Sequence, residues 1–218
     1  MHDGGGYYID VGANDPTTDS VTKFFYDKGW HGINIEPLLD KCALLAEKRP
    51  RDINLCVGLG SKRGKLKIFE SDKVSTFSAE IAGSKPINTL SNPQRLRTIL
   101  TLSEVHEKYC ATTQEIHFCK IDVEGFEEEV LKGVSDWHKF RPWVFCIEAT
   151  LPRTQIPNHE KWEHILLEND YVFAAQFDIN RYYVDAQREY LLKNFAKIPS
   201  FVSQNEVVKF NMFPVVFS

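Results

Sequence analysis

The chain has 218 residues, of which 43% are hydrophobic and 26% charged, and its formal net charge is -4 at pH 7. These values fit one globular domain over residues 1–218 with a core of ordinary size. The interspersed charges argue against a nucleic-acid partner, and no apolar run reaches the ~18 residues of a membrane span. Without a signal peptide before the first strand, we expect the protein to be cytoplasmic.

The five cysteines are scattered and show no CxxC or Cys/His ligand spacing. Two of them, Cys119 and Cys146, lie in apolar runs that predict buried strands. Cysteines of this kind are usually small core residues in a reducing compartment. We therefore expect neither disulfides nor a cysteine metal site.

In the first half of the chain, short apolar runs alternate with amphipathic segments, which predicts a parallel sheet flanked by helices. The expected elements are a strand at 7–11, a helix at 19–28, a strand at 32–36, a helix at 39–48 and a strand at 53–57. Gly64 predicts a hairpin turn before a half-exposed strand at 66–69. The polar stretch 71–93 is predicted to be a mobile loop.

The second half continues the same alternation. It predicts a helix at 102–109, strands at 116–122 and 143–148, and between them a helix at 126–133 whose first-turn acids suit its dipole. A helix at 160–169, a strand at 171–177, a short strand at 181–184 and a helix at 186–195 follow. The pattern as a whole predicts a Rossmann-like α/β fold.

Two acidic strand ends mark the expected ligand site, because open α/β sheets bind ligands beyond the carboxyl ends of their strands. The first strand ends in Asp10-Val11-Gly12-Ala13-Asn14, a small-residue turn in which Gly12 permits close backbone approach and Asp10 suits a cationic group. Glu36 ends the second strand, 24 positions after Gly12, where an acid suits the hydroxyls of a ribose.

The first turn departs from the G-x-G-x-x-G pattern that cradles a dinucleotide pyrophosphate. Asp15-Pro16 stands where further glycines would be needed. A cofactor without phosphates, S-adenosylmethionine, fits this turn better than NAD.

The most specific stretch of the sequence is Lys-Ile-Asp-Val-Glu-Gly-Phe-Glu-Glu-Glu-Val-Leu-Lys-Gly at residues 120–133. It resembles the central signature of the FkbM family of methyltransferases, and the turn at residues 10–14 is similar to the first motif of that family. Matching segments also occur at residues 101–102, 147–148 and 177–184 and at Pro199. The resemblance extends over residues 7–199, but Asp15-Pro16 and Ser103 depart from the usual family residues.

The resemblance implies a class I methyltransferase fold with a mostly parallel seven-stranded sheet and helices on both faces. It implies methyl transfer from S-adenosylmethionine to a hydroxyl of a sugar, a glycan or a related secondary metabolite. Helices usually precede the first strand in such enzymes, so we expect a module of a longer polypeptide, or a stub at residues 1–6 foreign to the domain. The expected cofactor-binding residues are Asp10, Gly12, Ala13, Asn14, Glu36, Pro37 and Asp122.

Methyl transfer to a hydroxyl needs alignment and removal of a proton. The candidate catalytic residues are Asp122, Glu124, Glu148 and His159. Asp122 and Glu148 end successive predicted strands and are also candidate ligands for Mg²⁺. No third ligand stands at a recognisable spacing, so the metal is not favoured.

Residues just beyond the sixth predicted strand are candidates for the acceptor pocket. Asn180, Arg181 and Tyr182 are the expected substrate-binding residues, with the tyrosine ring also suited to the core. The partner would be a small-molecule or glycan acceptor, and the module would be fused to or associated with enzymes of glycan biosynthesis.

Two alternatives stay open at this stage. One is an NAD-dependent oxidoreductase, which would require a fuller glycine fingerprint and a Tyr-x-x-x-Lys pair. The other is a non-catalytic Rossmann module that binds a glycan or a partner, which would not need the acids Asp10, Glu36 and Asp122.

Overall fold

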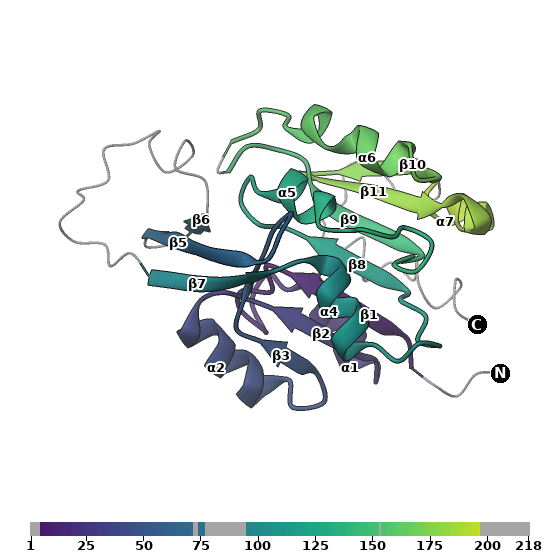
Figure 1. The fold of residues 1–218 in the computed structure, drawn as a ribbon. Coiled ribbons are helices and arrows are strands. Elements are labelled where there is room, and N and C mark those ends of the chain that lie inside the picture. Colours follow the sequence, from purple (N-terminus) through teal and green to yellow (C-terminus); the bar gives the residue numbers. More distant parts are fainter. Residues whose placement is uncertain (1–4, 72–73, 77–94, 153, 197–218) are drawn as a thin grey trace.

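The computed structural model of the chain describes residues 5–71, 74–76, 95–152 and 154–196. These residues form a seven-stranded sheet flanked by helices and a smaller four-stranded sheet (Figure 1). The large sheet consists of β1 (Tyr7–Val11), β2 (His31–Ile35), β3 (Ile53–Leu55), β8 (Phe118–Ile121), β9 (Val144–Glu148), β10 (Tyr171–Phe177) and β11 (Asn180–Asp185). The small sheet consists of β4 (Gly58–Leu59), β5 (Gly64–Ser71), β6 (Val74–Thr76) and β7 (Arg95–Leu100).

The strand order of the large sheet is β10-β11-β9-β8-β1-β2-β3. All neighbours are parallel except β11, which runs antiparallel to both β9 and β10. The prediction of a seven-stranded, mostly parallel sheet is therefore confirmed. The sheet is mixed rather than purely parallel, because β11 is antiparallel to its neighbours. The order reverses between β1 and β8, and their carboxyl ends form the kind of crevice where α/β proteins bind ligands.

Helices supply apolar side chains to both faces of this sheet. The helices are α1 (Val21–Asp27), α2 (Leu39–Lys48), α4 (Leu102–Tyr109), α5 (Glu127–Lys132), α6 (Glu163–Leu167) and α7 (Leu192–Phe195), with 3-10 helices η1 (His159–Lys161) and η2 (Ala186–Leu191). Side chains of α4, α5 and α6 belong to one core cluster, and those of α1, η2 and α7 to the other. A reciprocal capping box between Thr101 and Glu104 fixes the start of α4.

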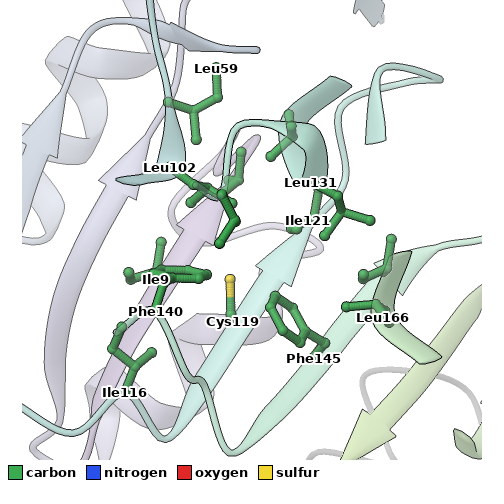
Figure 2. Close-up of a cluster of buried hydrophobic side chains, with 14 of the residues drawn as sticks. Ile9, Leu59, Leu102, Ile116, Cys119, Ile121, Leu131, Phe140, Phe145 and Leu166 are labelled. Carbon is green, nitrogen blue, oxygen red and sulfur yellow. The ribbon is translucent and has the colours of Figure 1, made fainter. Parts of the chain in front are cut away.

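Alternating side chains of the central strands enter the two clusters, as the pleat of a strand requires. Ile9, Cys119 and Phe145 lie in the α4–α5–α6 cluster (Figure 2), whereas Tyr8, Phe118 and Cys146 lie in the other. Burial on both faces explains why these strands are nearly continuous apolar runs. The charged side chains within β1, β8 and β9 are therefore exceptions that need a physical explanation.

Several predicted elements differ from the structure. Gly64 does not form a hairpin turn but begins β5, where it pairs with Ile99 of β7. The strand expected at 53–57 ends at Leu55 as β3, and the separate strand β4 follows at Gly58–Leu59. The helices expected at 160–169 and 186–195 each begin as a 3-10 helix. The predicted mobile loop at 71–93 lies largely outside the described residues, but Val74–Thr76 is a strand. Strand β7 was not predicted.

The small sheet extends from the carboxyl edge of the large one, where β5 and β7 project as a pair (Figure 1). The guanidinium Nε of Arg97 on β7 donates to the carbonyl of Pro37, which follows β2. This contact joins the small sheet to the expected cofactor edge.

All five cysteines are free, and Cys119 and Cys146 are buried as predicted. Among the described residues, no helix combines the length and apolar character needed to cross a membrane.

Candidate functional site

The charged residues of the central strands lie on the same face of the sheet, at its carboxyl edge. The register pairs Asp10 of β1 with Lys120 of β8, and Glu148 of β9 with Asn180 of β11. Asp122 follows β8 directly, at the level of Glu148, because Ile121 pairs with Ile147. The switch point predicted from the sequence thus carries a row of acids and one lysine.

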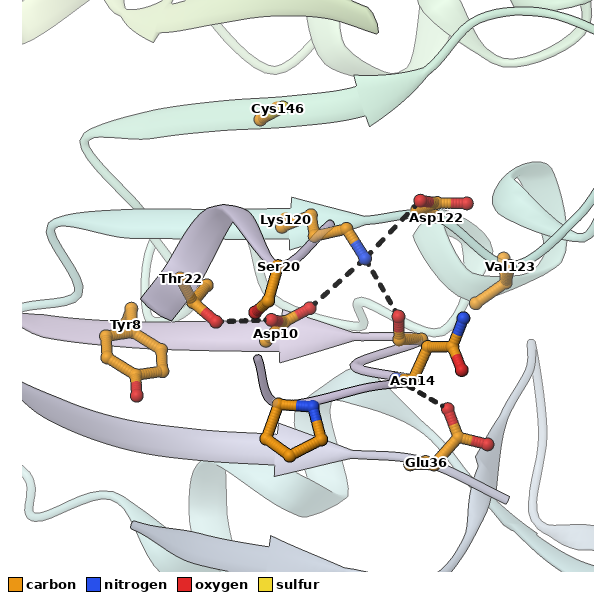
Figure 3. A network of polar contacts seen from close by, with 12 residues as sticks. Tyr8, Asp10, Asn14, Ser20, Thr22, Glu36, Lys120, Asp122, Val123 and Cys146 are labelled. Atoms are coloured by element: carbon orange, nitrogen blue, oxygen red, sulfur yellow. Dashed lines mark hydrogen bonds and ion pairs between the residues drawn. The ribbon is translucent and has the colours of Figure 1, made fainter. Parts of the chain in front are cut away.

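Lys120 lies at the centre of this row (Figure 3). Its ammonium donates to the carbonyl of Gly12 at 2.8 Å and lies 3.3 Å from Asp10 Oδ1 and 3.4 Å from Asp122 Oδ2. Burial lowers the pKa of Lys120, but Asp10 and Asp122 more than offset this, so that its pKa lies above the ordinary value. The lysine is therefore a permanent cation between two carboxylates.

Gly12 allows the turn after β1 to pack against the tip of β8. Its φ is +76°, and a Cβ at this position would lie 1.8 Å from the carbonyl oxygen of Asp122. The N–H groups of Gly12 and Ala13 donate to the carbonyl of Ile35, which fixes the same turn against β2. In this structure, Gly12 permits close approach of the chain to itself.

Glu36, just after β2, lies beside this turn. Its Oε2 accepts the N–H of Asn14 and its Oε1 the N–H of Leu38, each at 2.9 Å. The residue is only 4% exposed. Burial raises the pKa of Glu36, and these two N–H groups and Lys120 counteract the rise. Glu36 is thus a buried bridge between two turns rather than a solvated strand end.

The carboxyl groups of Asp122 and Glu148 lie side by side at the ends of β8 and β9. Burial raises the pKa of Glu148 well above its usual range, and the charges of Asp122, Glu127 and Glu124 and a hydrogen bond with Asp122 add to the rise. Glu148 is therefore protonated at neutral pH. The side chain of Asp122 is 33% exposed, so Asp122 is the member of the pair that a ligand can reach.

The turn between β8 and α5 contains the other acids. Glu124 and Gly125 adopt positive φ values of 55° and 94°. The buried Glu127 accepts the N–H groups of Val123 and Gly125 through Oε1, at 3.1 Å and 3.0 Å. Burial raises the pKa of Glu127 to about 7. Its carboxyl group holds the turn that presents Asp122 and Glu124.

Within the described part of the chain, no set of three or more His, Cys, Asp or Glu side chains is arranged to hold a metal ion. The structure does bring Asp122 and Glu148 together, as the magnesium hypothesis requires. Mg²⁺ commonly keeps several water ligands and is bound through one or two carboxylates, so this pair stays a candidate for the magnesium hypothesis.

His159 and Arg181 lie together, but they do not join the acids. Arg181 donates to Tyr183 Oη at 2.9 Å and to Glu163 Oε1 at 2.6 Å, and its Nη1 lies 3.1 Å from His159 Nε2. Tyr183 belongs to the α4–α5–α6 cluster, so this group is on the opposite face of the sheet from Asp122 and Lys120.

The other two expected acceptor residues are on the same face as the acids. Asn180 is buried beside Glu148, with its Oδ1 3.9 Å from the sulfur of Cys146. Tyr182 is 0% exposed and packs between Phe177 and Phe195. This burial favours the core role of its ring over stacking on a sugar.

Three residues that support the site were not singled out from the sequence. Lys120 lies inside the recognised signature, and an ammonium within an apolar strand is a signal in itself. Thr22 and Arg49 gave no signal, since their partners are distant in the sequence: Thr22 Oγ1 donates to Asp10 and accepts from Arg49 Nη1.

Two comparisons with known proteins give matches, one to a protein family and one to a solved structure. The family model described as the methyltransferase FkbM domain matches residues 10–173. Among solved structures, the chain is similar to the crystal structure of methyltransferase FkbM from Methylobacillus flagellatus KT, with a TM-score of 0.51 and 16% identity. The similarity covers 84% of this chain and 44% of that one, so the chain spans less than half of that protein. No curated protein matches the chain.

Proposed function

Since this chain belongs to the FkbM methyltransferase family, we propose that it is an S-adenosylmethionine-dependent O-methyltransferase acting on a hydroxyl of a sugar, glycan or related secondary metabolite. The observation that carries the cofactor part is the arrangement at the carboxyl edge of the sheet, where Glu36 and Asp122 lie on either side of the turn that contains Asn14 (Figure 3). Methyl transfer follows from the family. The acceptor class rests on the sequence resemblance alone.

The residues present fit this cofactor, which carries a positive charge and no phosphate. Each carboxylate oxygen of Glu36 uses one lone pair for a backbone N–H, and the second is free in principle for a ribose hydroxyl. Asp122 offers a partly exposed negative charge to a cationic group. The ammonium of Lys120 points at protein oxygens, so it adds no anion site to the crevice.

When bound, S-adenosylmethionine would supply a methyl group already activated by the positive sulfonium. The chain would then have to align a hydroxyl and accept its proton. Asp122 suits this role because Lys120 holds its carboxyl group in place and its side chain is partly exposed. Glu148, already protonated, lies at the level of Asp122 and adds no second negative charge beside it.

The remaining candidates take secondary places in this proposal. Glu124 leaves the same turn as Asp122 and is the next candidate base. His159 and Arg181 lie on the other face of the sheet. A direct role for them would require an acceptor that reaches both faces of the sheet. The proposal needs no metal.

Ligand binding separates this function from the alternatives. Calorimetry should show binding of S-adenosylmethionine and of its demethylated product S-adenosylhomocysteine, and none of NAD. Binding of NAD alone would return the chain to the oxidoreductase reading, and binding of neither would favour a non-catalytic module. Incubation with labelled S-adenosylmethionine and a panel of glycans would then identify the acceptor.

A further inference from the structure

A continuous chain of polar side chains runs from the helix layer to the carboxyl edge. The guanidinium of Arg49 is buried and donates through Nη1 to Thr22 Oγ1 at 2.8 Å. Thr22 Oγ1 lies 2.5 Å from Asp10 Oδ2. Asp10 Oδ1 lies 3.3 Å from Lys120 Nζ, which in turn contacts Asp122. Four of these five residues are almost completely buried, and Asp122 is the exposed end.

The direction of the proton on Thr22 follows from the chemistry of its partners. A guanidinium has only donors, so the Thr22 oxygen must accept from Arg49. The hydroxyl of Thr22 therefore donates its hydrogen to Asp10 Oδ2. The other oxygen of Asp10, Oδ1, faces Lys120. Arg49 is itself fixed, since its Nη2 donates to the carbonyl of Pro16 and to Ser20 Oγ.

The ammonium of Lys120 has three N–H donors, and three oxygens surround it: Asp10 Oδ1, Asp122 Oδ2 and the carbonyl of Gly12. The ammonium is thus directed at protein oxygens: it donates a hydrogen bond to Gly12 and forms ion pairs with both carboxyl groups. Its contacts join the turn after β1 to the tip of β8, the two segments between which the proposed cofactor would bind.

We propose that Lys120 and Thr22 are positioning residues for methyl transfer: Thr22 orients Asp10, Asp10 holds the ammonium, and the ammonium sets the Asp122 carboxylate and the Gly12 turn. This inference rests on the proposed function. It differs from an ordinary buried ion pair in one respect. Removal of the buried Thr22 hydroxyl, which hydrogen-bonds Asp10 rather than Asp122, should change the ligand site.

The test compares Thr22→Val, which removes the hydroxyl at nearly constant volume, with Thr22→Ser, which keeps it. Tyr171→Phe is the matched control, because the buried Tyr171 hydroxyl donates to the carbonyl of Pro142 and touches none of these residues. Two readouts are taken for each protein: the affinity for S-adenosylhomocysteine by calorimetry, and the ¹⁵N NMR signal of the Lys120 ammonium, assigned by its absence in Lys120→Arg.

Wild type should show a slowly exchanging Lys120 signal that shifts when S-adenosylhomocysteine is added. Thr22→Val should lose that signal and bind the ligand about tenfold or more weakly, as expected when a hydrogen bond to a charged group is lost. Thr22→Ser should keep the Lys120 signal and the affinity for S-adenosylhomocysteine. Tyr171→Phe should leave the signal and the affinity at wild-type values while lowering the stability of the fold.

The inference is overturned if Thr22→Val folds and binds S-adenosylhomocysteine with unchanged affinity, whether or not the Lys120 NMR signal is lost. If Thr22→Val does not fold, wild type still decides: a Lys120 signal that does not move on ligand binding overturns the inference as well. Failure of the proposed function looks different, because wild type would then retain the Lys120 signal but bind no S-adenosylhomocysteine, and the inference would fall with it.

Discussion

The carboxylate of Glu36 accepts the backbone N–H of Asn14 at 2.9 Å, so an acid from the end of β2 holds the turn that follows β1. Asn14 has a positive φ of 47°, a conformation that only a few residue types adopt readily. Glu36 thereby connects the shape of the first turn to the expected ribose position. We therefore expect a substitution at Glu36 to change both the shape of the first turn and the binding of the ribose.

Replacement of Glu36 by alanine should weaken binding of S-adenosylhomocysteine by ~1.5–3 kcal/mol, the range for hydrogen bonds to a charged group. It should also destabilise the fold, because the N–H groups of Asn14 and Leu38 lose their acceptor. Calorimetry and thermal unfolding give the two values. Asp40→Ala, at a nearby exposed acid in α2, is the control and should leave affinity unchanged. Unchanged affinity in Glu36→Ala would leave Glu36 with a purely structural role.

Gly12→Ala should be among the most destabilising single substitutions in the chain. The new Cβ would lie 1.8 Å from the Asp122 carbonyl oxygen, and the φ of +76° adds a backbone penalty of ~1–2 kcal/mol. We expect a loss of more than ~3 kcal/mol in the free energy of unfolding, or no folded protein.

Gly64→Ala provides the control for that substitution. A Cβ at Gly64 meets nothing within 4 Å, and its backbone lies outside the left-handed region. Its unfolding free energy should stay within about 0.5 kcal/mol of wild type, the usual range for surface changes. Equal effects of the two substitutions in urea denaturation would contradict the packing described for the first turn.

Asp122→Asn should reduce turnover by ~10²-fold or more, the contribution typical of a general base, with little change in acceptor affinity. Glu148→Gln should have a much smaller effect, because Glu148 is already protonated and an amide resembles its neutral form. Rates of methyl transfer at saturating S-adenosylmethionine would measure both.

The same assay tests the metal. The proposed function assigns no step to a metal, so activity should survive EDTA. Loss of activity with EDTA and recovery with Mg²⁺ would instead make Asp122 and Glu148 metal ligands. Survival of full activity in Asp122→Asn would move the base to Glu124 or His159.

The carboxyl group of Glu127 should make stability depend on pH. Burial raises its pKa from 4.5 to about 7 in the folded protein, so the folded state binds more protons between these values. Its contribution is therefore complete below about pH 4.5 and is lost as the pH rises through 7, on the order of 3 kcal/mol in total.

Glu127→Gln removes this titration and keeps an oxygen for the N–H groups of Val123 and Gly125. Relative to wild type, it should gain stability from pH 5 to pH 8 in urea denaturation. Glu128→Gln, which removes a carboxylate paired with Lys132 at the surface, controls for the lost charge and should show no such gain. Parallel pH profiles of wild type and Glu127→Gln would contradict the raised pKa.

Periodicity predicts the elements whose stability is mainly local. The strands at Tyr7–Val11 and Tyr171–Phe177 and the helices at Leu39–Lys48 and Leu102–Tyr109 have the predicted bounds. Of the small sheet, only the strand at 66–69 was predicted, as part of β5, because the other strands depend on distant pairing. Strand β4 has two residues, and β7 pairs with β5 across a long intervening segment.

The same limit applies to the site. The acids at strand ends could be recognised from their position after apolar runs, but their environment could not. Three facts depend on contacts between residues up to 110 positions apart: Glu36 is buried, Glu148 is neutral, and Lys120 joins Asp10 to Asp122. The faces of β11 likewise became assignable only once its antiparallel register with β9 was known.

The antiparallel placement of β11 also brings the turn before it to the carboxyl edge of the sheet. Asp178 and Ile179 form the two-residue turn from β10 into β11, and the Ile179 carbonyl accepts the N–H of Ala149 at 2.7 Å. That turn is attached to the sheet beside Glu148, while β1 and β2 are anchored elsewhere. Insertions or substitutions in this turn would therefore alter the surroundings of Glu148 without touching the turns at Gly12 and Glu36. Under the proposed function, a single hairpin would then set which acceptors fit.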